Sequence, residues 1–434
     1  MRHKKILAHL VLVAVIMLVC LAISPRPALA ASLSVSPTSG KFDTVVYVYG
    51  TGFTPGVTYR TYFAYGTTYE SVRSGTVAVD GTVSPSIRVP EVPGGSYTIR
   101  VETAYESASG TFSVLPAVSL DKTSAAVGDQ VTVSGTGFRA SRRVNISFDG
   151  SVIETTSTNS IGSFTSTFKV PACYNRTADV EASDGAFVAS KQLTILASIS
   201  LSPTSGKVGE EITVTGNGFR SNRSITLTVD GAEVDTEPES IRSNSMGCFE
   251  ASLDIPVSSQ GSHSVRAYDG ANAAKASFTT LADISLNPTS GRIGTEITVS
   301  GTGFGSSTVV TVRFSNKHVR TTATDITGNF TTQFLVPQYQ TGNYEVSASD
   351  NVATASTNFT LTVSVNVSPT SGHVGTPINV TGSGFIGAIT VRYDNTVVVT
   401  TTADGNGDFS ATFNAPASTH GHHKITVSGA ISTV

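Results

Sequence analysis

Residues 202–219 read SPTSGKVGEEITVTGNGF, and the fold of the chain can be predicted from this segment. It holds a Pro-Thr-Ser-Gly turn, an alternation of apolar and polar residues, and a Gly-x-Gly-Phe unit. Strict alternation, here with Ile212 and Val214 as the apolar members, predicts a β-strand with one buried face. The two glycines permit a left-handed or closely approached backbone, and we expect Phe219 to fill the end of a β-sandwich.

The same unit recurs along the whole chain. The Gly-x-Gly-Phe copies lie at 50–53, 135–138, 216–219, 301–304 and 382–385, with successive separations of 85, 81, 85 and 81 residues. A Gly-x-Phe motif follows in four copies, at 162–164, 247–249, 328–330 and 407–409. Such self-similarity is the signature of tandem domains. Seven or so short strands per copy predict an antiparallel immunoglobulin-like (Ig-like) sandwich.

We therefore expect an all-β chain of five tandem Ig-like antiparallel β-sandwich domains after a signal peptide. The expected ranges are 1–30 for the signal peptide, 31–115 for repeat 1, 116–196 for repeat 2, 197–281 for repeat 3, 282–362 for repeat 4 and 363–434 for repeat 5. Phe112, Phe278 and Phe359 each mark a closing strand 17 residues after a glycine. The counterpart in repeat 5 would fall near position 438, so we expect repeat 5 to be incomplete and the chain to be part of a longer protein.

Residues 202–219 resemble the start of an IPT/TIG domain, and the resemblance covers all five repeats. The second half of each repeat, with its Val-Pro and Gly-x-Tyr sequences, is more similar to tandem repeats of bacterial surface proteins than to the receptor versions of the family. The resemblance implies an Ig-like fold and an extracellular, modular use. It carries over no catalytic residues.

The first thirty residues have the composition of a secretory signal peptide. Basic residues precede an apolar run from Ile6 to Ile23, and small residues at Ala28 and Ala30 suit a cleavage site. We expect a secreted or cell-surface protein, and a retained membrane span is the alternative. Removing the four basic residues of this segment leaves 24 Lys+Arg against 31 Asp+Glu, a formal charge of −7. That balance argues against nucleic acid as a partner.

No constellation in the sequence predicts catalysis, and we expect a non-enzymatic protein without cofactor or metal. Cys173 and Cys248 lie in different repeats at non-equivalent positions, so we expect two unpaired thiols and no disulfide framework. His420 and His422 would share one face of a strand and suggest a metal site. No Cys or carboxylate lies close by in the sequence to complete it.

Two further sequence patterns suggest a catalytic or metal site, but each has a structural interpretation. Ser166 and Lys169 match a Ser-x-x-Lys nucleophile motif, but that motif needs a helix and this segment is expected to be a strand. Asp184, Asp269 and Asp350 recur after the penultimate strand of three repeats. We interpret them as hairpin-turn residues. A calcium site is the alternative, but Ca²⁺ needs six to eight oxygen ligands and too few carboxylates are available at each junction.

Repeat 1 differs from the others in its aromatic content, because it holds eight of the thirteen tyrosines. Since Val46 and Val48 should face the core, Tyr47 and Tyr49 should face outward. We take Tyr47, Tyr49 and Tyr62 as a candidate contact surface for an extracellular protein or glycan. The alternative is that tyrosines here only favour strand formation.

The function that these features favour is a non-enzymatic extracellular stalk or adhesin-like surface protein. Its modules would present surfaces for protein or glycan contact, and a segment after Val434 would anchor it to a cell envelope. The alternative is the non-catalytic accessory region of a secreted polysaccharide-active enzyme whose catalytic domain lies beyond the end of this chain.

Overall fold

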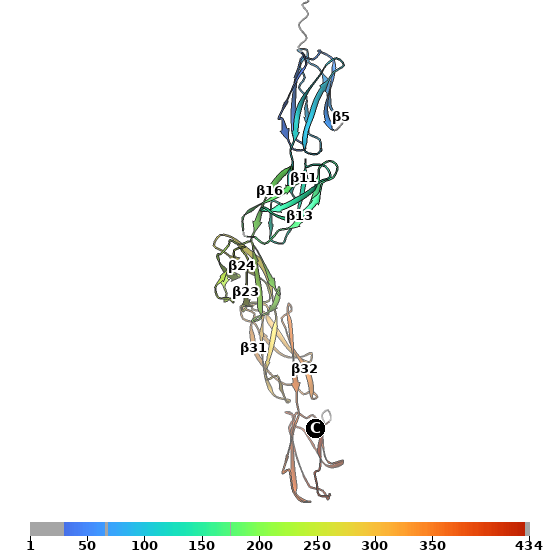
Figure 1. Cartoon of the computed structure of the whole chain (residues 1–434). Helices are drawn as coiled ribbons and strands as arrows, with labels where there is room; N and C mark the ends of the chain where they lie inside the picture. Colours follow the sequence, from blue (N-terminus) through green and yellow to red (C-terminus); the bar gives the residue numbers. More distant parts are fainter. Residues whose placement is uncertain (1–29, 66–67, 174, 430–434) are drawn as a thin grey trace, which may run out of the picture. The chain divides into compact units, whose positions relative to one another are not determined.

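The computed structural model describes residues 30–65, 68–173 and 175–429 (Figure 1). Throughout these ranges the regular secondary structure is β-strand, which confirms the all-β expectation. Residues 1–29 of the expected signal peptide lie outside the described residues. Among the described residues, no helix is long and apolar enough to span a membrane.

Repeats 1 and 2 each fold as a three-stranded sheet against a five-stranded sheet, in Ig-like sandwich topology. Repeat 1 contains β1 (Ser32–Ser36), β2 (Ser39–Gly40), β3 (Val45–Thr51), β4 (Thr58–Tyr65), β5 (Thr68–Thr76), β6 (Ser86–Arg88), β7 (Gly95–Glu102) and β8 (Ser107–Val114), in the sheets β1-β3-β6 and β2-β8-β7-β4-β5. Repeat 2 contains β9 (Ala117–Leu120), β10 (Ser124–Ala126), β11 (Gln130–Thr136), β12 (Arg143–Phe148), β13 (Ser151–Ser157), β14 (Phe164–Lys169), β15 (Thr177–Ser183) and β16 (Val188–Leu196), in the sheets β14-β11-β9 and β10-β16-β15-β12-β13.

Repeats 3 and 4 follow the same plan. Repeat 3 contains β17 (Ser198–Ser202), β18 (Ser205–Lys207), β19 (Glu211–Asn217), β20 (Ser224–Val229), β21 (Ala232–Glu233), β22 (Ile241–Arg242), β23 (Phe249–Asp254), β24 (Gly261–Tyr268) and β25 (Ala273–Leu281), in the sheets β17-β19-β23 and β18-β25-β24-β20-β21, with β22 also paired to β20. Repeat 4 contains β26 (Asp283–Asn287), β27 (Ser290–Gly291), β28 (Glu296–Thr302), β29 (Val309–Phe314), β30 (Lys317–Ala323), β31 (Phe330–Leu335), β32 (Gly342–Ser349) and β33 (Thr354–Leu361), in the sheets β26-β28-β31 and β27-β33-β32-β29-β30.

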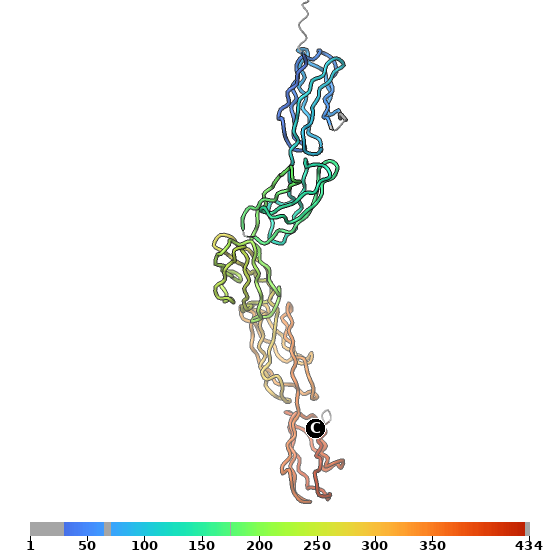
Figure 2. The backbone as a smooth tube through the Cα atoms, in the orientation of Figure 1, coloured from blue at the N-terminus to red at the C-terminus, as the bar shows by residue number. Residues whose placement is uncertain are grey.

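Repeat 5 has two three-stranded sheets in its described residues, β34-β35-β38 and β37-β36-β39. Its strands are β34 (Ser364–Ser368), β35 (Pro377–Ser383), β36 (Ala388–Tyr393), β37 (Thr396–Thr402), β38 (Phe409–Asn414) and β39 (Ile425–Ser428). Within residues 363–429 no strand corresponds to β33, the closing strand of repeat 4. In Figure 2 the backbone completes the strands of one repeat before it enters the next.

The Pro-Thr-Ser-Gly stretch is more than the turn that its composition predicts. In repeat 3 its Ser205 and Gly206 open β18, which pairs with Thr279 and Thr280 of β25 in parallel. The preceding strand β17 pairs antiparallel with β19 in the other sheet. The chain therefore crosses between sheets here and enters the second sheet in the same direction as the closing strand, which makes the pairing parallel. Repeats 1, 2 and 4 each have the same short parallel pair.

The Gly-x-Gly-Phe unit closes one end of each sandwich. In repeat 4 Phe304 is fully buried, and its ring lies edge-on to Phe330, with ring centroids 5.3 Å apart. A side chain on Gly301 would place its Cβ 2.1 Å from the Phe330 ring, so no residue larger than glycine fits. Gly303 has φ +69°, in the left-handed region that glycine adopts at no steric cost. The Phe of Gly-x-Gly-Phe and the Phe of Gly-x-Phe therefore form one packing unit.

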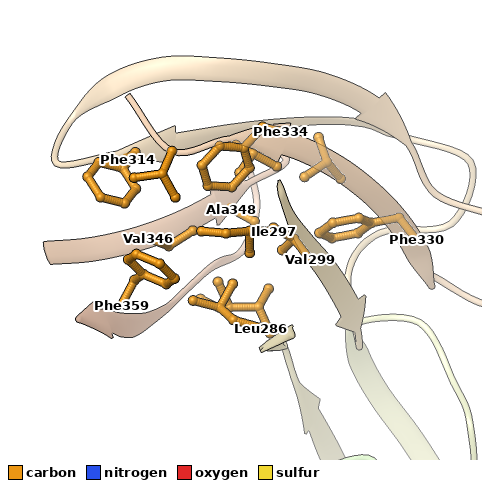
Figure 3. Packing of buried hydrophobic residues seen from close by; sticks show 14 of the residues in the cluster. Leu286, Ile297, Val299, Phe314, Phe330, Phe334, Val346, Ala348 and Phe359 are labelled. Atoms are coloured by element: carbon orange, nitrogen blue, oxygen red, sulfur yellow. The ribbon is translucent and has the colours of Figure 1, made fainter. Parts of the chain in front are cut away.

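The core of repeat 4 is drawn from both of its sheets, as Figure 3 shows. The labelled residues come from β26, β28 and β31 on one side and from β29, β32 and β33 on the other: Leu286, Ile297, Val299, Phe330 and Phe334, then Phe314, Val346, Ala348 and Phe359. Corresponding clusters occupy repeats 1, 3 and 5. Each of these repeats thus has an apolar core of its own.

Contacts group the chain into two compact units. The first comprises Met1–Pro171 and Arg176–Leu196, and the second comprises Ala172–Asn175 and Ala197–Val434. The segment Ala172–Asn175 is therefore the one part of repeat 2 whose contacts place it in the second unit.

Candidate functional site

The aromatic pair of repeat 1 lies on the outer face of the three-stranded sheet. Burial alternates along β3, where Val46 and Val48 are in the core and Tyr47 and Tyr49 are exposed, by 66% and 52%. The outward orientation that the period of two predicts for Tyr47 and Tyr49 is therefore confirmed. Because β3 is the middle strand of its sheet, both rings stand on the centre of the face and not at its edge.

Hydroxyl groups surround these two rings. On β1, Ser34 lies opposite Tyr49 and Ser36 lies opposite Tyr47, and on β6 Ser86 lies opposite Tyr47. The Ser34 hydroxyl donates a hydrogen bond of 3.2 Å to the Tyr49 carbonyl. We call Ser34, Ser36, Tyr47, Tyr49 and Ser86 the tyrosine face. It combines two apolar ring surfaces with a rim of hydrogen-bonding groups.

An ion pair borders the tyrosine face. Arg88 lies in register with Val45 at the end of β6, and its guanidinium contacts the Asp43 carboxylate at 2.9 Å. Both side chains are more than half exposed, so the pair contributes on the order of 0–1 kcal/mol to stability. Its charges remain available to a partner.

Tyr62 does not belong to this surface, and the prediction that groups it with Tyr47 and Tyr49 is wrong. It lies on β4, opposite Ser71 of β5 and Arg100 of β7, in the five-stranded sheet, and it is half-buried. The outer faces of the two sheets of a sandwich point in opposite directions. Alternation shows which way a residue points within its strand, but it does not show which sheet the strand joins.

Other repeats have small polar residues where repeat 1 has tyrosines. In repeat 2 these are Thr132 and Ser134 on β11, and the Ser134 hydroxyl pairs with that of Thr165 at 3.2 Å on the neighbouring strand. Repeat 3 has Thr213 and Thr215 at the corresponding positions. The tyrosine face is therefore a property of repeat 1 and not of the repeat fold.

A buried aspartate holds the hairpin after the penultimate strand in repeats 2, 3 and 4. The Asp269 side chain is fully buried, and one of its oxygens accepts hydrogen bonds from the backbone N–H of Ala271 at 2.9 Å and Asn272 at 2.7 Å. The other accepts the N–H of Arg220 at 2.8 Å, just after Gly-x-Gly-Phe. Asp184 and Asp350 make the corresponding bonds. Only the recurrence of Asp at one position signals this role in the sequence.

The charge state of Asp269 follows from these bonds. Burial alone raises the pKa of a carboxyl group, but here the hydrogen bonds from the backbone of Asn272, Arg220 and Ala271 outweigh it and lower the pKa to about 2. The N–H of Asp269 also donates to the Asn272 carbonyl across the turn. The hairpin-turn interpretation is confirmed, and the carboxylate serves the fold of its own repeat.

The histidines of repeat 5 do not lie as the sequence suggests. His420 and His422 are exposed in the loop before β39 and not on a strand, so the argument from alternation fails for them. Among the described residues no cluster of three His, Cys, Asp or Glu could hold a metal ion. His423 is half-buried, with Nδ1 2.8 Å from an Asp394 carboxylate oxygen and Nε2 2.9 Å from the Thr419 carbonyl.

The His423 contacts predict a pH-dependent stability of repeat 5. Both ring nitrogens face acceptors, which favours the doubly protonated ring, and the Asp394 carboxylate with the Thr419 carbonyl raises the pKa of His423. A raised folded-state pKa gives stabilisation that is fully present below the unfolded value near 6.5 and is lost as pH rises through the folded value. Hydrogen exchange of repeat 5 amides should therefore speed up between pH 6 and 9 beyond the intrinsic chemical rate. His423→Gln should remove that change and His422→Gln should keep it.

The chain was compared with known families and structures. The IPT/TIG domain family model matches residues 197–280 and 284–363. No curated protein matches the chain. Among solved structures, a tetra-tandem repeat from the extending region of a large adhesion protein is 18% identical, with 77% of this chain and 99% of that one covered and a TM-score of 0.20. Invasin, a bacterial integrin-binding protein, is 11% identical, with 79% and 81% covered and a TM-score of 0.21.

Proposed function

Because residues 197–280 and 284–363 are IPT/TIG domains in a series of Ig-like repeats, we propose that this chain is a non-enzymatic, exported array of binding modules. In this proposal the signal peptide directs the protein out of the cell, and the later repeats hold repeat 1 away from the cell envelope. Repeat 1 makes the contact with the partner. The observation that carries the proposal is the tyrosine face, with its two exposed rings at the centre of a sheet.

The surroundings of the rings favour a glycan over a protein as the partner. Protein interfaces have an apolar core, whereas the cross-strand neighbours of Tyr47 and Tyr49 are the polar residues Ser34, Ser36 and Ser86. A sugar ring offers apolar C–H groups for stacking and hydroxyls for hydrogen bonds, which matches the tyrosine face. The proposed ligand class is therefore an extracellular polysaccharide or glycoprotein glycan.

One copy of the tyrosine face would bind weakly. Two tyrosines that each cover roughly 100 Å² contribute on the order of 5 kcal/mol before the cost of association. Linking many copies on one surface raises the avidity by roughly 10² to 10⁴ without any new contact. The proposal therefore places the protein in a multivalent arrangement.

The double substitution Tyr47→Ser with Tyr49→Ser should reduce glycan binding at least tenfold. The side chains are exposed, so the melting temperature should stay nearly unchanged. The measurement is a glycan array probed with residues 31–434 displayed on beads. Tyr105→Ser is the matched control, since Tyr105 is 73% exposed in repeat 1 but lies in the hairpin between β7 and β8. Failure of the unsubstituted protein to bind any glycan, or undiminished binding by the double variant, would reject the proposal.

A further inference from the structure

A chain of backbone hydrogen bonds brings the two cysteines of the described chain to one place in the second unit. The N–H of Asn175 donates to the Phe219 carbonyl at 3.1 Å, and the N–H of Phe219 donates to the Gly247 carbonyl at 3.0 Å. Cys173 lies two residues before Asn175, and Cys248 directly follows Gly247. The two thiols therefore lie at the two ends of a short backbone bridge, although 75 positions separate them in the sequence.

The same pair of backbone hydrogen bonds occurs between repeats 3 and 4. There it shows how closely the segment before the penultimate strand approaches the Gly-x-Phe turn of the next repeat. There the N–H of Gln260 donates to the Phe304 carbonyl at 2.9 Å, and the N–H of Phe304 donates to the Gly328 carbonyl at 3.1 Å. A Cβ on Gly328 would lie only 3.0 Å from the Cα of Ser259. The residues that flank this approach correspond to Cys173 and Cys248.

Repeat 1 and all of repeat 2 except Ala172–Asn175 lie in the first unit, and a side-chain contact occurs between them at the corresponding backbone bridge. The counterparts of Cys173 and Cys248 there are Val92 and Ser163, as the bonds from Gly94 to Phe138 and from Phe138 to Gly162 establish. The Ser163 hydroxyl donates a 2.5 Å hydrogen bond to the carboxylate of Glu91, the neighbour of Val92. A side chain at the Cys248 position therefore contacts a side chain of the segment that carries the Cys173 position.

The surroundings of the two thiols agree with a short separation. Cys173 is buried, and Cys248 is partly buried with its Sγ 3.6 Å from the Met246 carbonyl. Burial, and then the charge of Cys248, raise the pKa of Cys173 to about 11, and burial also raises the pKa of Cys248. The charge of one thiolate raises the pKa of another thiol only when the two groups interact through space.

We propose that Cys173 and Cys248 are a redox pair that closes to a disulfide when the protein meets an oxidising environment. The oxidant is an organic disulfide, RSSR. One Cys thiolate attacks RSSR and releases RS⁻, and the second thiolate attacks the mixed disulfide and releases a second RS⁻. The Sγ–Sγ bond forms as the protein loses two electrons, RSSR gains them, and the two RS⁻ take up the two thiol protons. The bond ties segment Ala172–Asn175 covalently to the Gly-x-Phe turn of repeat 3.

The expectation of two unpaired thiols rested on their non-equivalent positions in the repeat. Both cysteines are free thiols in the structure. Their non-equivalent positions in the repeat belong to two kinds of segment that meet between neighbouring repeats. Cys173 precedes a penultimate strand, Cys248 sits in a Gly-x-Phe turn, and the hydrogen-bonded bridge joins these two kinds of segment. The pairing does not depend on the proposed glycan contact, and it can be tested on purified protein.

The test is oxidation of the reduced chain 31–434 by oxidised glutathione. The expected product has lost both free thiols, gains no glutathione, remains a monomer and yields one cross-linked Cys173–Cys248 peptide by mass spectrometry. Because both thiols have a raised pKa, the rate should increase about tenfold per pH unit between pH 7 and 9. The glycan array gives a separate readout, so failure of this pairing and failure of the tyrosine face are distinguishable.

Two variants make the oxidation test decisive. Cys248→Ser should give no cross-link, and Cys248→Ser combined with Ser252→Cys should also give none, because Ser252 lies on β23, away from the bridge. A glutathione adduct on each cysteine, a disulfide-linked dimer, or two thiols that persist at pH 9 would each overturn the proposal. Urea-unfolded chain under the same oxidant checks that both thiols are chemically competent.

Discussion

Replacement of Phe304 by alanine should destabilise repeat 4 by about 4 kcal/mol. The Phe304 ring is fully buried at the end of the sandwich and packs edge-on to Phe330, so its removal loses both the transfer free energy and the contacts that filled the space. Hydrogen exchange of the chain 31–434 is the measurement, because it reports each repeat separately. Amides of β28 and β32 should exchange about a thousandfold faster, as this change in free energy requires.

The control for this prediction is Val309→Ala, which removes an apolar side chain that is 62% exposed in the same repeat. It should change stability by less than about 0.5 kcal/mol. Because stability in a tandem array is close to a sum of domain terms, amides of repeat 1 should be unaffected by either substitution. A Phe304→Ala protein that exchanges like the unsubstituted chain would show that the Gly-x-Gly-Phe unit does not hold the sandwich end together.

Asp269→Ala is expected to destabilise repeat 3 by about 3 kcal/mol. The substitution leaves the backbone N–H groups of Arg220, Ala271 and Asn272 without their acceptor in a buried position. Exchange of β24 and β25 amides should report the loss, and unchanged protection there would contradict the role of the carboxylate. Asp254→Ala, at an exposed strand end, is the matched control and should be nearly neutral.

Asp269 also contributes to the acid sensitivity of repeat 3. Its folded-state pKa of about 2 lies below the ordinary value, so the stabilisation is present above the unfolded pKa near 3.9 and is lost as pH falls toward 2. In the Asp269→Ala protein this part of the acid dependence should disappear. His423 acts in the opposite direction in repeat 5, where the stabilisation is lost as pH rises.

The sequence predicted the orientation of two residues of the candidate surface and placed a third on the wrong sheet. The outward orientation of Tyr47 and Tyr49 follows from the two valines that alternate with them. The inclusion of Tyr62 failed because sheet membership depends on which strands pair, and β4 pairs with β5 and β7. No pattern within β4 itself carries that information.

The repeat, the strand faces and the positions that need glycine can be predicted from the sequence alone, because these depend on residues within about one strand and turn. The folded chain was needed to show that Asp269 accepts a bond from Arg220, 49 positions away, and that backbone hydrogen bonds through Phe219 connect the segments of Cys173 and Cys248. Both depend on loops that meet after the sheets have packed. Local alternation specifies which side of a strand is buried, whereas the pairing of distant segments is set by the global arrangement that buries those sides together.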